Sequence, residues 1–576
     1  MAKVVIDGVE YEVNPDNNLL QEALSKGLDL PYFCWHPCMG SVGACRQCAV
    51  KQYRDSDDTK GSIVMACMTP ATEGTIISID DDQAKDMRER VIESLMISHP
   101  HDCPVCEEGG ECHLQDMTLM SGHNYRRYDK KKITHRNQYL GPFINHEMNR
   151  CITCYRCVRF YDDYAGGTDL AAQASHHHTY FGRYEEGVLE SEFSGNLVEV
   201  CPTGVFTDKA FSEHYSRKWD LQTAPSICAG CGTGCNITPG ERYGTLRRVV
   251  NRYNADVNGY FICDRGRFGF DYVNSAERIR LPEDIDIIQE LEKFRGGDVV
   301  GIGSPRASIE SNFALREFVG ERNFFSGLSD IDNEAIQLTL SLGQDASFRS
   351  PSVKEIEAAD AVIIVGEDVT NTSPRLALAI RQSVRNQATD LAKQARIPVW
   401  QDAAVRELAQ HERSPLILLT PYATRLDDVA SDILVGPPSE LIQTAGAIAG
   451  AISENAPKIQ GVRDRAAQIA DILLNAKRPL VVAGASAGKI EYIKTAANIA
   501  RALSEKREEI VDLCLSTSEA NSLGMSMLIN KENSLGIALN KIIQGDARKV
   551  IVLENDLYRR APHSEVAKAL EKTESL

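Results

Sequence analysis

Sixteen residues in the first half of the chain have the types and the spacing of metal ligands. Fifteen are cysteines and one is a histidine, and only Cys38 and Cys514 of the 17 cysteines fall outside the pattern. They form four sets: Cys34, Cys45, Cys48 and Cys67 (set one); His99, Cys103, Cys106 and Cys112 (set two); Cys151, Cys154, Cys157 and Cys201 (set three); and Cys228, Cys231, Cys235 and Cys263 (set four). Thiolates are soft donors that suit iron–sulfur clusters or zinc. Four such sites in one chain predict a conductor of single electrons rather than a hydrolase or a binding module.

Set one has the spacing C-x10-C-x2-C-x18-C, with two cysteines on one tight loop. Gly43 and Ala44 precede Cys45 and are small enough for backbone N–H groups to approach inorganic sulfide, and such hydrogen bonds help to set a cluster's potential. The sequence therefore predicts a [2Fe–2S] cluster, with zinc as the alternative. Cys38 competes with Cys34 as the first ligand, and we assign Cys34.

Set two combines one imidazole with three thiolates in the spacing H-x3-C-x2-C-x5-C. By itself this spacing also fits a zinc site. His101 and His113 lie nearby in the sequence and are alternatives to His99. Replacing a thiolate by a neutral imidazole changes the charge of a cluster and therefore its potential. Because three other cluster-type sets accompany this one, we expect a [4Fe–4S] cluster held by His99 and the three cysteines.

Set three is the most specific of the four. The run C-x2-C-x2-C followed by a distant Cys-Pro is typical of ferredoxin-type [4Fe–4S] ligation. Pro202 fixes its φ angle and has no N–H, which stiffens the turn that carries Cys201. Set four has the spacing C-x2-C-x3-C, with Cys263 28 positions after Cys235, and also fits a [4Fe–4S] cluster. Zinc is the alternative in both sets.

The composition is that of a soluble globular protein, with 576 residues, 43% hydrophobic and 25% charged. This length is too great for one core and predicts three to five domains. The net charge of −18 argues against a nucleic-acid partner. No apolar run is long enough for a transmembrane helix, and the start MAKVVIDGVEYEV lacks the pattern of a signal peptide. We therefore expect a reducing cytosolic environment, in which closely spaced cysteines bind metal rather than form disulfides.

The elements expected around the sets differ between the two halves of the chain. Residues 3–13 predict a hairpin with Asp7-Gly8 as its turn, and residues 19–24 predict a helix that ends near Gly27. These elements, followed by a cysteine loop, are typical of a ferredoxin-like β-grasp. After residue 272, apolar strands at 298–302, 361–365, 479–483 and 550–553 alternate with helical stretches such as 374–385 and 489–503. This alternation predicts α/β layers around a mostly parallel sheet.

Six stretches, in this order, resemble the large iron–sulfur subunit of respiratory complex I, the G subunit of the bacterial NADH:quinone oxidoreductases. They are FCWHPCMGSVGACRQCAV, HPHDCPVCEEGGECHLQD, RCITCYRCVRF, SGNLVEVCPTGVFTDK, CAGCGTGC and CDRGRFGFDYV. The resemblance covers nearly the whole chain. It implies an electron-transfer subunit of a proton-translocating, membrane-associated complex of the respiratory chain, which uses NAD and a quinone such as ubiquinone. The subunit itself is expected to make and break no substrate bonds.

The resemblance also implies an electron path and partners. Electrons would pass from an FMN-containing, NADH-oxidising flavoprotein subunit to set three, then to set two, and on to a ferredoxin-like two-cluster subunit on the path to quinone. The set one cluster would face the flavoprotein, and set four would lie off the main path. Other peripheral-arm subunits are expected as neighbours. The chain would reach the membrane only through the complex, at the cytoplasmic face of the bacterial inner membrane.

Four domains are implied: a [2Fe–2S] ferredoxin-like domain at 1–80, a two-[4Fe–4S] domain at 81–220, a third [4Fe–4S] domain at 221–275, and an α/β domain at 276–576. The last resembles molybdopterin oxidoreductases such as formate dehydrogenase, and the chain looks short for the family. An alternative function is therefore the catalytic subunit of an NAD-linked molybdenum formate dehydrogenase.

The alternative needs a cysteine-type metal ligand in the α/β domain. Leu338 and Thr339 stand where the ligand and its following histidine align, and no cysteine occurs from 264 to 513. Cys514 follows far too late and is expected to be a buried structural thiol. We therefore expect no molybdenum, and an α/β domain that serves as a scaffold for assembly.

Overall fold

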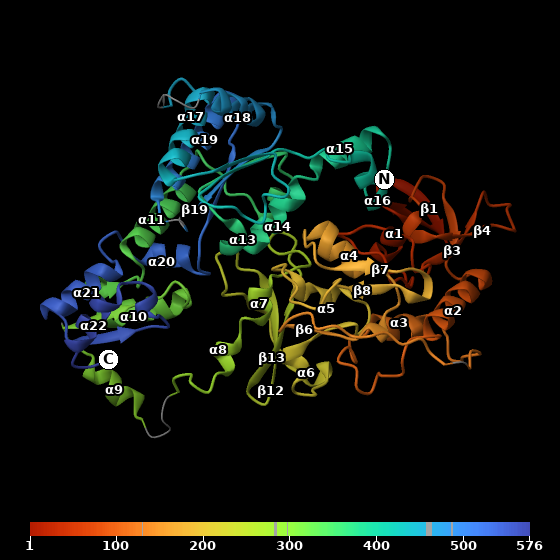
Figure 1. Cartoon of the computed structure of the whole chain (residues 1–576), viewed down its shortest axis with the longest axis horizontal. Helices are drawn as coiled ribbons and strands as arrows, with labels where there is room; N and C mark the ends of the chain where they lie inside the picture. The colour runs from red at the N-terminus through yellow and green to blue at the C-terminus, as the bar shows by residue number, and fades with distance from the viewer. Residues whose placement is uncertain (130, 281–284, 297, 457–462, 485, 487) are drawn as a thin grey trace.

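The computed structural model describes residues 1–129, 131–280, 285–296, 298–456, 463–484, 486 and 488–576. A small sheet domain holds the N-terminus, a loop-rich middle part follows, and two α/β sheets form the second half of the chain (Figure 1). The sheet domain lies at the right of Figure 1, and the α/β sheets lie at the top and the left. All four cysteine-containing sets belong to the sheet domain and the middle part.

The N-terminal domain is a five-stranded sheet in the order β2-β1-β5-β3-β4, with helix α1 packed against it. The elements are β1 (Ala2–Ile6), β2 (Val9–Val13), α1 (Leu19–Ser25), β3 (Ala49–Tyr53), β4 (Ser62–Met65) and β5 (Ile76–Ser78). The predicted hairpin is confirmed, since β1 and β2 pair antiparallel and the turn residues Asp7 and Gly8 have φ of 48° and 78°, as a type I′ turn requires. The Asn18 side chain caps α1 by accepting from the Gln21 N–H (2.8 Å). The domain therefore has the expected ferredoxin-like fold.

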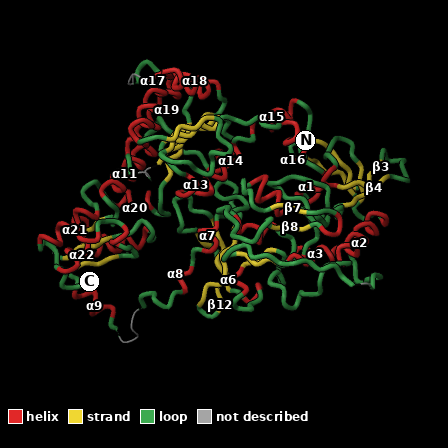
Figure 2. The backbone as a smooth tube through the Cα atoms, in the orientation of Figure 1, coloured by secondary structure: helices red, strands yellow, loops and turns green. Residues whose placement is uncertain are grey.

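Loops held by short elements make up most of the middle part (Figure 2). Its helices are α2 (Asp82–Met96), α3 (His113–Met120), α4 (Arg156–Val158), α5 (Leu197–Val200) and α6 (Lys209–Ser212). Strand β6 (Ile144–His146) pairs with β9 (Phe206–Asp208), and β7 (Ala171–Gln173) pairs with β8 (Tyr180–Gly182). Large aromatic side chains fill its core, among them Phe160, Tyr161, Phe181, Phe193 and Phe206. This packed core holds loops that have few ladder hydrogen bonds of their own.

A four-stranded antiparallel sheet carries set four. Its strands are β10 (Gln222–Thr223), β11 (Ser226–Ile227), β12 (Asn236–Arg242) and β13 (Thr245–Asn251). Helices α7 (Asp264–Phe268) and α8 (Asp271–Asn274) follow. Cys228 comes directly after β11, Cys235 directly before β12, and Cys263 directly before α7, so that element ends position three of the four set-four residues.

The second half of the chain contains two parallel sheets, which confirms the predicted α/β class. The strand orders are β15-β14-β21 and β18-β17-β16-β19-β20, and every pair is parallel. The strands are β14 (Val299–Ile302), β15 (Phe324–Phe325), β16 (Ala361–Val365), β17 (Leu416–Thr420), β18 (Asp432–Val435), β19 (Pro479–Gly484), β20 (Asp512–Ser516) and β21 (Lys549–Val552). The helices are α9 (Ile287–Lys293), α10 (Ile309–Val319), α11 (Asp330–Gln344), α12 (Val353–Glu357), α13 (Val369–Thr372), α14 (Pro374–Ser383), α15 (Asn386–Gln394), α16 (Asp402–Ala409), α17 (Pro438–Ile452), α18 (Arg463–Asn475), α19 (Ile490–Arg507), α20 (Ser522–Leu528), α21 (Leu535–Gln544) and α22 (His563–Glu571).

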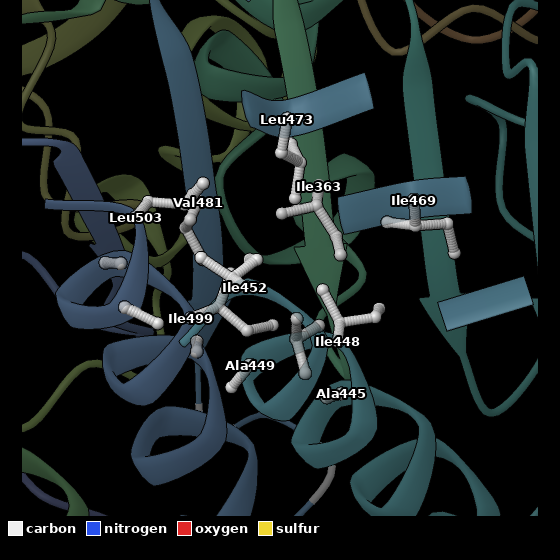
Figure 3. Close-up of a cluster of buried hydrophobic side chains, with 14 of the residues drawn as sticks. Ile363, Ala445, Ile448, Ala449, Ile452, Ile469, Leu473, Val481, Ile499 and Leu503 are labelled. Carbon is white, nitrogen blue, oxygen red and sulfur yellow. The ribbon is translucent and has the colours of Figure 1, made fainter. Parts of the chain in front are cut away.

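The larger sheet is covered by helices on both faces. On one face, Ile363 of β16 and Val481 of β19 share a buried cluster with Ile448 of α17 and Leu503 of α19 (Figure 3). On the other face, Ile364 and Val482 pack with Ile380 of α14. Successive side chains along each strand point to opposite faces of the sheet, and helices cover both faces. Both sets of side chains are therefore buried, which explains why these strands are apolar throughout.

Gly366 directly follows β16 and gives the first testable prediction. Its φ is +71°, and a Cβ at this position would overlap the ring of Tyr492. We expect Gly366→Ala to lower the free energy of unfolding of the α/β half by about 3 kcal/mol, because it adds overpacking to backbone strain. Urea denaturation followed by circular dichroism measures this. Gly436→Ala is the control, since a Cβ there meets the flexible end of Glu440 (3.0 Å), and equal stability of the two variants would contradict the expectation.

Hydrogen bonds join the α/β half to the metal-ligand region at several points. The Ser41 N–H donates to the Trp400 carbonyl (2.8 Å), and the Gln382 side chain donates to the Tyr164 carbonyl (2.8 Å). The Gly232 N–H donates to the Thr517 carbonyl (3.1 Å), which attaches the set four loop to the end of β20. The α/β half therefore supports sets one, three and four directly. Within the described residues, no helix has the length and apolar character needed to cross a membrane.

Candidate metal centres

Set one is brought together by the loop between α1 and β3 and by a 3-10 turn after β4. All four cysteines are buried. Cys34 and Cys45 share one buried cluster, Cys48 and Cys67 share another, and the Cys67 N–H donates to the Cys48 sulfur (3.4 Å). Cys38, the alternative first ligand, instead packs against the aromatic core of the middle part, and burial raises the pKa of its thiol to about 12.

Set two surrounds one small cavity, which His99, Cys103, Cys106 and Cys112 all line. The His99 Nδ1 atom is buried and has no hydrogen-bond partner among the described residues. His101 is exposed, and the His113 Nε2 lies 2.7 Å from the Tyr32 carbonyl, so neither alternative histidine lines this cavity. An imidazole nitrogen without a partner beside three thiols is the donor set that a soft metal requires.

Two further residues complete the wall of the set two cavity. Gly204 leaves room for the Cys106 sulfur, because a Cβ at Gly204 would overlap Sγ of that cysteine. The buried Arg150 guanidinium donates to the Gly204 carbonyl (3.2 Å) and to Glu107 (3.0 Å). Arg150 directly precedes Cys151, so it connects the wall of set two to the first residue of set three. The sequence pattern did not single out either residue.

A clamp from residues 215–219 covers the loop that carries set two. The Arg217 guanidinium donates to the carbonyls of Cys106 (2.8 Å) and Cys103 (3.3 Å). Gly109 and Gly110 permit this approach, since a Cβ would lie 2.8 Å from Arg217 Nη1 at the first position and 2.5 Å from the Trp219 ring at the second. Buried Lys218 pairs with Glu108 (2.9 Å) beneath the clamp. The Gly-Gly pair between Cys106 and Cys112 was the sequence signal that could have indicated this close approach.

Set three also surrounds a small cavity, which is lined by its four cysteines together with Pro202, Tyr155 and Phe206. Thr153 and Tyr155 have φ of 54° and 62°, which is uncommon for residues with a side chain. These left-handed residues coil the chain so tightly that three cysteines line the same cavity. The Thr153 N–H approaches the Cys151 sulfur (3.2 Å), and the Cys201 sulfur lies 3.6 Å from the Thr203 hydroxyl. Donors to sulfur of this kind stabilise thiolate.

Set four is gathered at the ends of β11, β12 and α7. All four cysteines are 5–7% exposed. The Cys228 N–H donates to the Cys235 carbonyl (2.8 Å), and the Gly230 N–H approaches the Cys228 sulfur (3.4 Å). A Cβ on Gly266 would lie 3.0 Å from the Cys228 sulfur and 4.0 Å from the Cys263 sulfur, so glycine lets α7 lie against both.

Burial controls the protonation of these thiols. It raises the pKa of Cys112, Cys154 and Cys263 to about 12 in each case. Without a cation these thiols are therefore protonated at neutral pH, and a bound metal would convert them to thiolate and release protons.

Within the described ranges, no three His, Cys, Asp or Glu side chains converge as the ligands of a single metal ion do. Sets two and three instead surround cavities.

The four sets adjoin one another through shared apolar cores. Cys34 and Cys45 of set one lie in the same buried cluster as Cys154 of set three, and Cys112 of set two packs against it. Cys157 and Cys201 of set three share a second cluster with Cys263 of set four. The buried Arg159 guanidinium donates to the Cys34 carbonyl (2.8 Å) from the turn that follows Cys157. The arrangement is therefore a continuous series of thiol groups, most of which are buried.

Family models match four stretches of the chain. The NADH-quinone oxidoreductase subunit 3 ferredoxin-like domain matches residues 141–207, and the NADH-ubiquinone oxidoreductase-G iron-sulfur binding region matches residues 88–127. A 2Fe-2S iron-sulfur cluster binding domain matches residues 1–82, and the molybdopterin oxidoreductase Fe4S4 domain matches residues 221–275. The chain therefore contains domains of both the 2Fe-2S and the 4Fe-4S binding type.

Relatives align with nearly the whole chain. The NADH-quinone oxidoreductase G subunit of Pseudomonas fluorescens is 56% identical over 99% of this chain and 64% of its own length. The G subunits of Salmonella typhimurium and Escherichia coli K12 are 53% and 52% identical, with the same coverage. The chain thus spans 64% of the length of these curated relatives. A solved chain of an NAD+-reducing [NiFe]-hydrogenase is 27% identical over 36% of this chain and 88% of its own, but its TM-score of 0.33 is too low to indicate a shared overall arrangement.

Proposed function

We propose that the chain belongs to the family of NADH-quinone oxidoreductase G subunits, with which nearly its whole length aligns, and that it relays single electrons from an NADH-oxidising flavoprotein towards quinone. The observation that carries the proposal is the continuity of the four sets through shared buried clusters. Electron transfer needs closely spaced carriers whose surroundings tune their potentials. The chain needs no catalytic side chains of its own for this role.

The sixteen residues named as ligands hold one [2Fe–2S] and three [4Fe–4S] clusters in this proposal. Set one binds the [2Fe–2S] cluster, and sets two, three and four each bind a [4Fe–4S] cluster. When bound, each cluster supplies a centre that accepts and releases one electron at a time. The unpartnered His99 nitrogen, the thiol-lined cavities and the left-handed turns at Thr153 and Tyr155 support these assignments.

The proposed path runs from the flavoprotein to set three, next to set two, and then to a ferredoxin-like two-cluster subunit. The solvent exposure of residues near sets one and two supports this assignment of entry and exit. Cys103 of set two is exposed at the surface, beside the exposed Tyr215 and Trp219, so that set two offers a point of exit. Set one, on the loop with exposed Ala44 and Arg46, faces the flavoprotein. Other peripheral-arm subunits surround the chain, at the cytoplasmic face of the inner membrane.

The α/β half holds no molybdenum in this proposal. Leu338 and Thr339, which align with the metal ligand and its histidine, lie in α11. The buried Thr339 hydroxyl donates to the Ala335 carbonyl of the same helix (2.9 Å), as a structural side chain does. Neither side chain is a soft donor. The half acts instead as a scaffold on which sets one, three and four rest.

Metal analysis of the anaerobically purified chain tests the proposal. One [2Fe–2S] and three [4Fe–4S] clusters predict about 14 iron atoms per chain with matching acid-labile sulfide, and no molybdenum or tungsten. Zinc in place of iron in any set would overturn the assignment of that set. Stoichiometric molybdenum or tungsten would make the chain the catalytic subunit of a formate dehydrogenase type and would contradict the scaffold role.

A further inference from the structure

A buried polar junction connects the α/β half to set four. At its centre is Arg375, which is only 5% exposed and is the second residue of α14. Helix α14 lies above α7 and the middle part in Figure 1. Its Nε donates to the Asn258 carbonyl (3.0 Å), and its Nη2 donates to the Glu357 carboxylate of α12 (2.7 Å).

Hydrogen bonds extend from this junction to the backbone of a set four residue. The Asn258 Oδ1 accepts from the Asn236 N–H (2.9 Å), and its Nδ2 donates to the Asn236 carbonyl (3.3 Å). Asn236 directly follows Cys235, so these two hydrogen bonds from Asn258 fix the backbone next to this cysteine. Asn258 is fully buried, and Arg375 holds its carbonyl. A side chain of the α/β half therefore fixes the peptide next to Cys235.

The charge of Arg375 is only partly neutralised on its buried side. Glu357 is 30% exposed, whereas the Arg375 side chain is 6% exposed, so the carboxylate lies towards solvent. One residue, Asn258, links the Arg375 guanidinium by hydrogen bonds to the peptide that follows Cys235. The Arg375 Nη1 atom is buried and has no hydrogen-bond partner among the described residues. An unpaired buried donor of this kind indicates an acceptor that the protein chain does not supply.

We propose that Arg375 is a positioning residue that balances the negative charge of the set four cluster and holds Cys235 in place. The proposal rests on the ligand set assigned above. A cation beside an iron–sulfur cluster stabilises the reduced form, which carries one more negative charge, and therefore raises the midpoint potential. The α/β half would then both hold the backbone next to Cys235 in place and supply a positive charge near the set four cluster, although none of its own residues is assigned as a metal ligand.

Redox titration of the reconstituted full chain, followed by electron paramagnetic resonance, tests the charge effect. We expect Arg375→Met to shift the set four midpoint to lower potential, and Glu357→Gln to shift it to higher potential, since each removes one charge of opposite sign. Arg375→Lys keeps a cation at this position, so its set four midpoint potential should lie close to that of the wild type. The midpoint potentials of sets one to three should be unchanged in all three variants. Shifts of opposite sign cannot arise from general damage to the fold.

Arg381→Met is the matched control, because Arg381 lies on the same helix and pairs with Asp428 (2.8 Å). It should leave the set four midpoint unchanged. An unshifted set four midpoint in both Arg375→Met and Glu357→Gln, with about 14 iron atoms retained, would overturn the proposal while leaving the ligand sets intact. A wild-type chain that never acquires the fourth cluster would instead refute the ligand set, and the role of Arg375 with it. If Arg375→Met does not fold, the upward shift in Glu357→Gln still decides the question.

Discussion

Replacing Cys154 by alanine will stop electron transfer from NADH to quinone in the assembled complex, while NADH oxidation by artificial acceptors at the flavoprotein continues. Cys154 lines the set three cavity and shares a buried cluster with Cys34 and Cys45 of set one. Its removal takes away one of four thiolates from the site that adjoins both set two and set four. An incomplete site at that place interrupts the only proposed route through the chain. The measurement is the rate of quinone reduction beside the rate with an artificial acceptor, on purified complex.

Cys514→Ala is the matched control for this experiment. Cys514 lies in β20 and belongs to none of the four sets, so its loss should leave both rates near those of the wild type. Iron analysis should show about four iron atoms fewer in Cys154→Ala and no change in Cys514→Ala. Wild-type quinone reduction by an assembled Cys154→Ala complex would refute the assigned path.

Gly204→Ala is expected to remove the set two cluster without touching a ligand. The added Cβ would overlap the Cys106 sulfur, and Arg150, which holds the Gly204 carbonyl, prevents the backbone from retreating. Cys106 must therefore leave the cavity that it shares with His99, Cys103 and Cys112. We expect iron to fall from about 14 to about 10 atoms per chain and the electron paramagnetic resonance signal of set two to disappear.

The control for Gly204→Ala is the same substitution at Gly343 of α11, where a Cβ would meet no atom within 4 Å. That variant should keep all of its iron and should gain a little helix stability. Full iron content in Gly204→Ala would mean that the loop can relax, and that Gly204 is not needed for set two.

Local patterns predicted much of this structure. Asp7-Gly8 determined the first hairpin, and the apolar runs at 361–365 and 479–483 became adjacent parallel strands. In sets two and three, cysteines two or three residues apart line one cavity, because residues so close in the chain have only a few ways to point. These signals act over short distances along the chain, and sequence reasoning can detect them without knowledge of tertiary contacts.

The residues that surround the sets could not be found in this way. Arg217, Arg150 and Arg375 act on loops that their own sequence neighbourhoods do not indicate, because the contacts form only when distant segments dock. Thr153 and Tyr155 adopt positive φ although their side chains disfavour it, so local preference predicts the opposite conformation. Packing around the set three cavity overrides that preference, and the packing is not visible in the order of residues.

The clamp of Arg217 and Trp219 over the set two loop has a consequence for biogenesis. During synthesis, residues 99–112 leave the ribosome about a hundred residues before the clamp, an interval of roughly 5–20 s at typical elongation rates. Until the clamp docks, the loop is open to a donor that delivers the cofactor. After docking, the hydrogen bonds from Arg217 to the Cys103 and Cys106 carbonyls hold the loop in place. Oxygen or a chelator would then remove the proposed cofactor more readily once these bonds have broken. In the proposed assignment, the cofactor would therefore enter this site more readily before the clamp docks than after it, and its later loss would depend on how often the clamp opens.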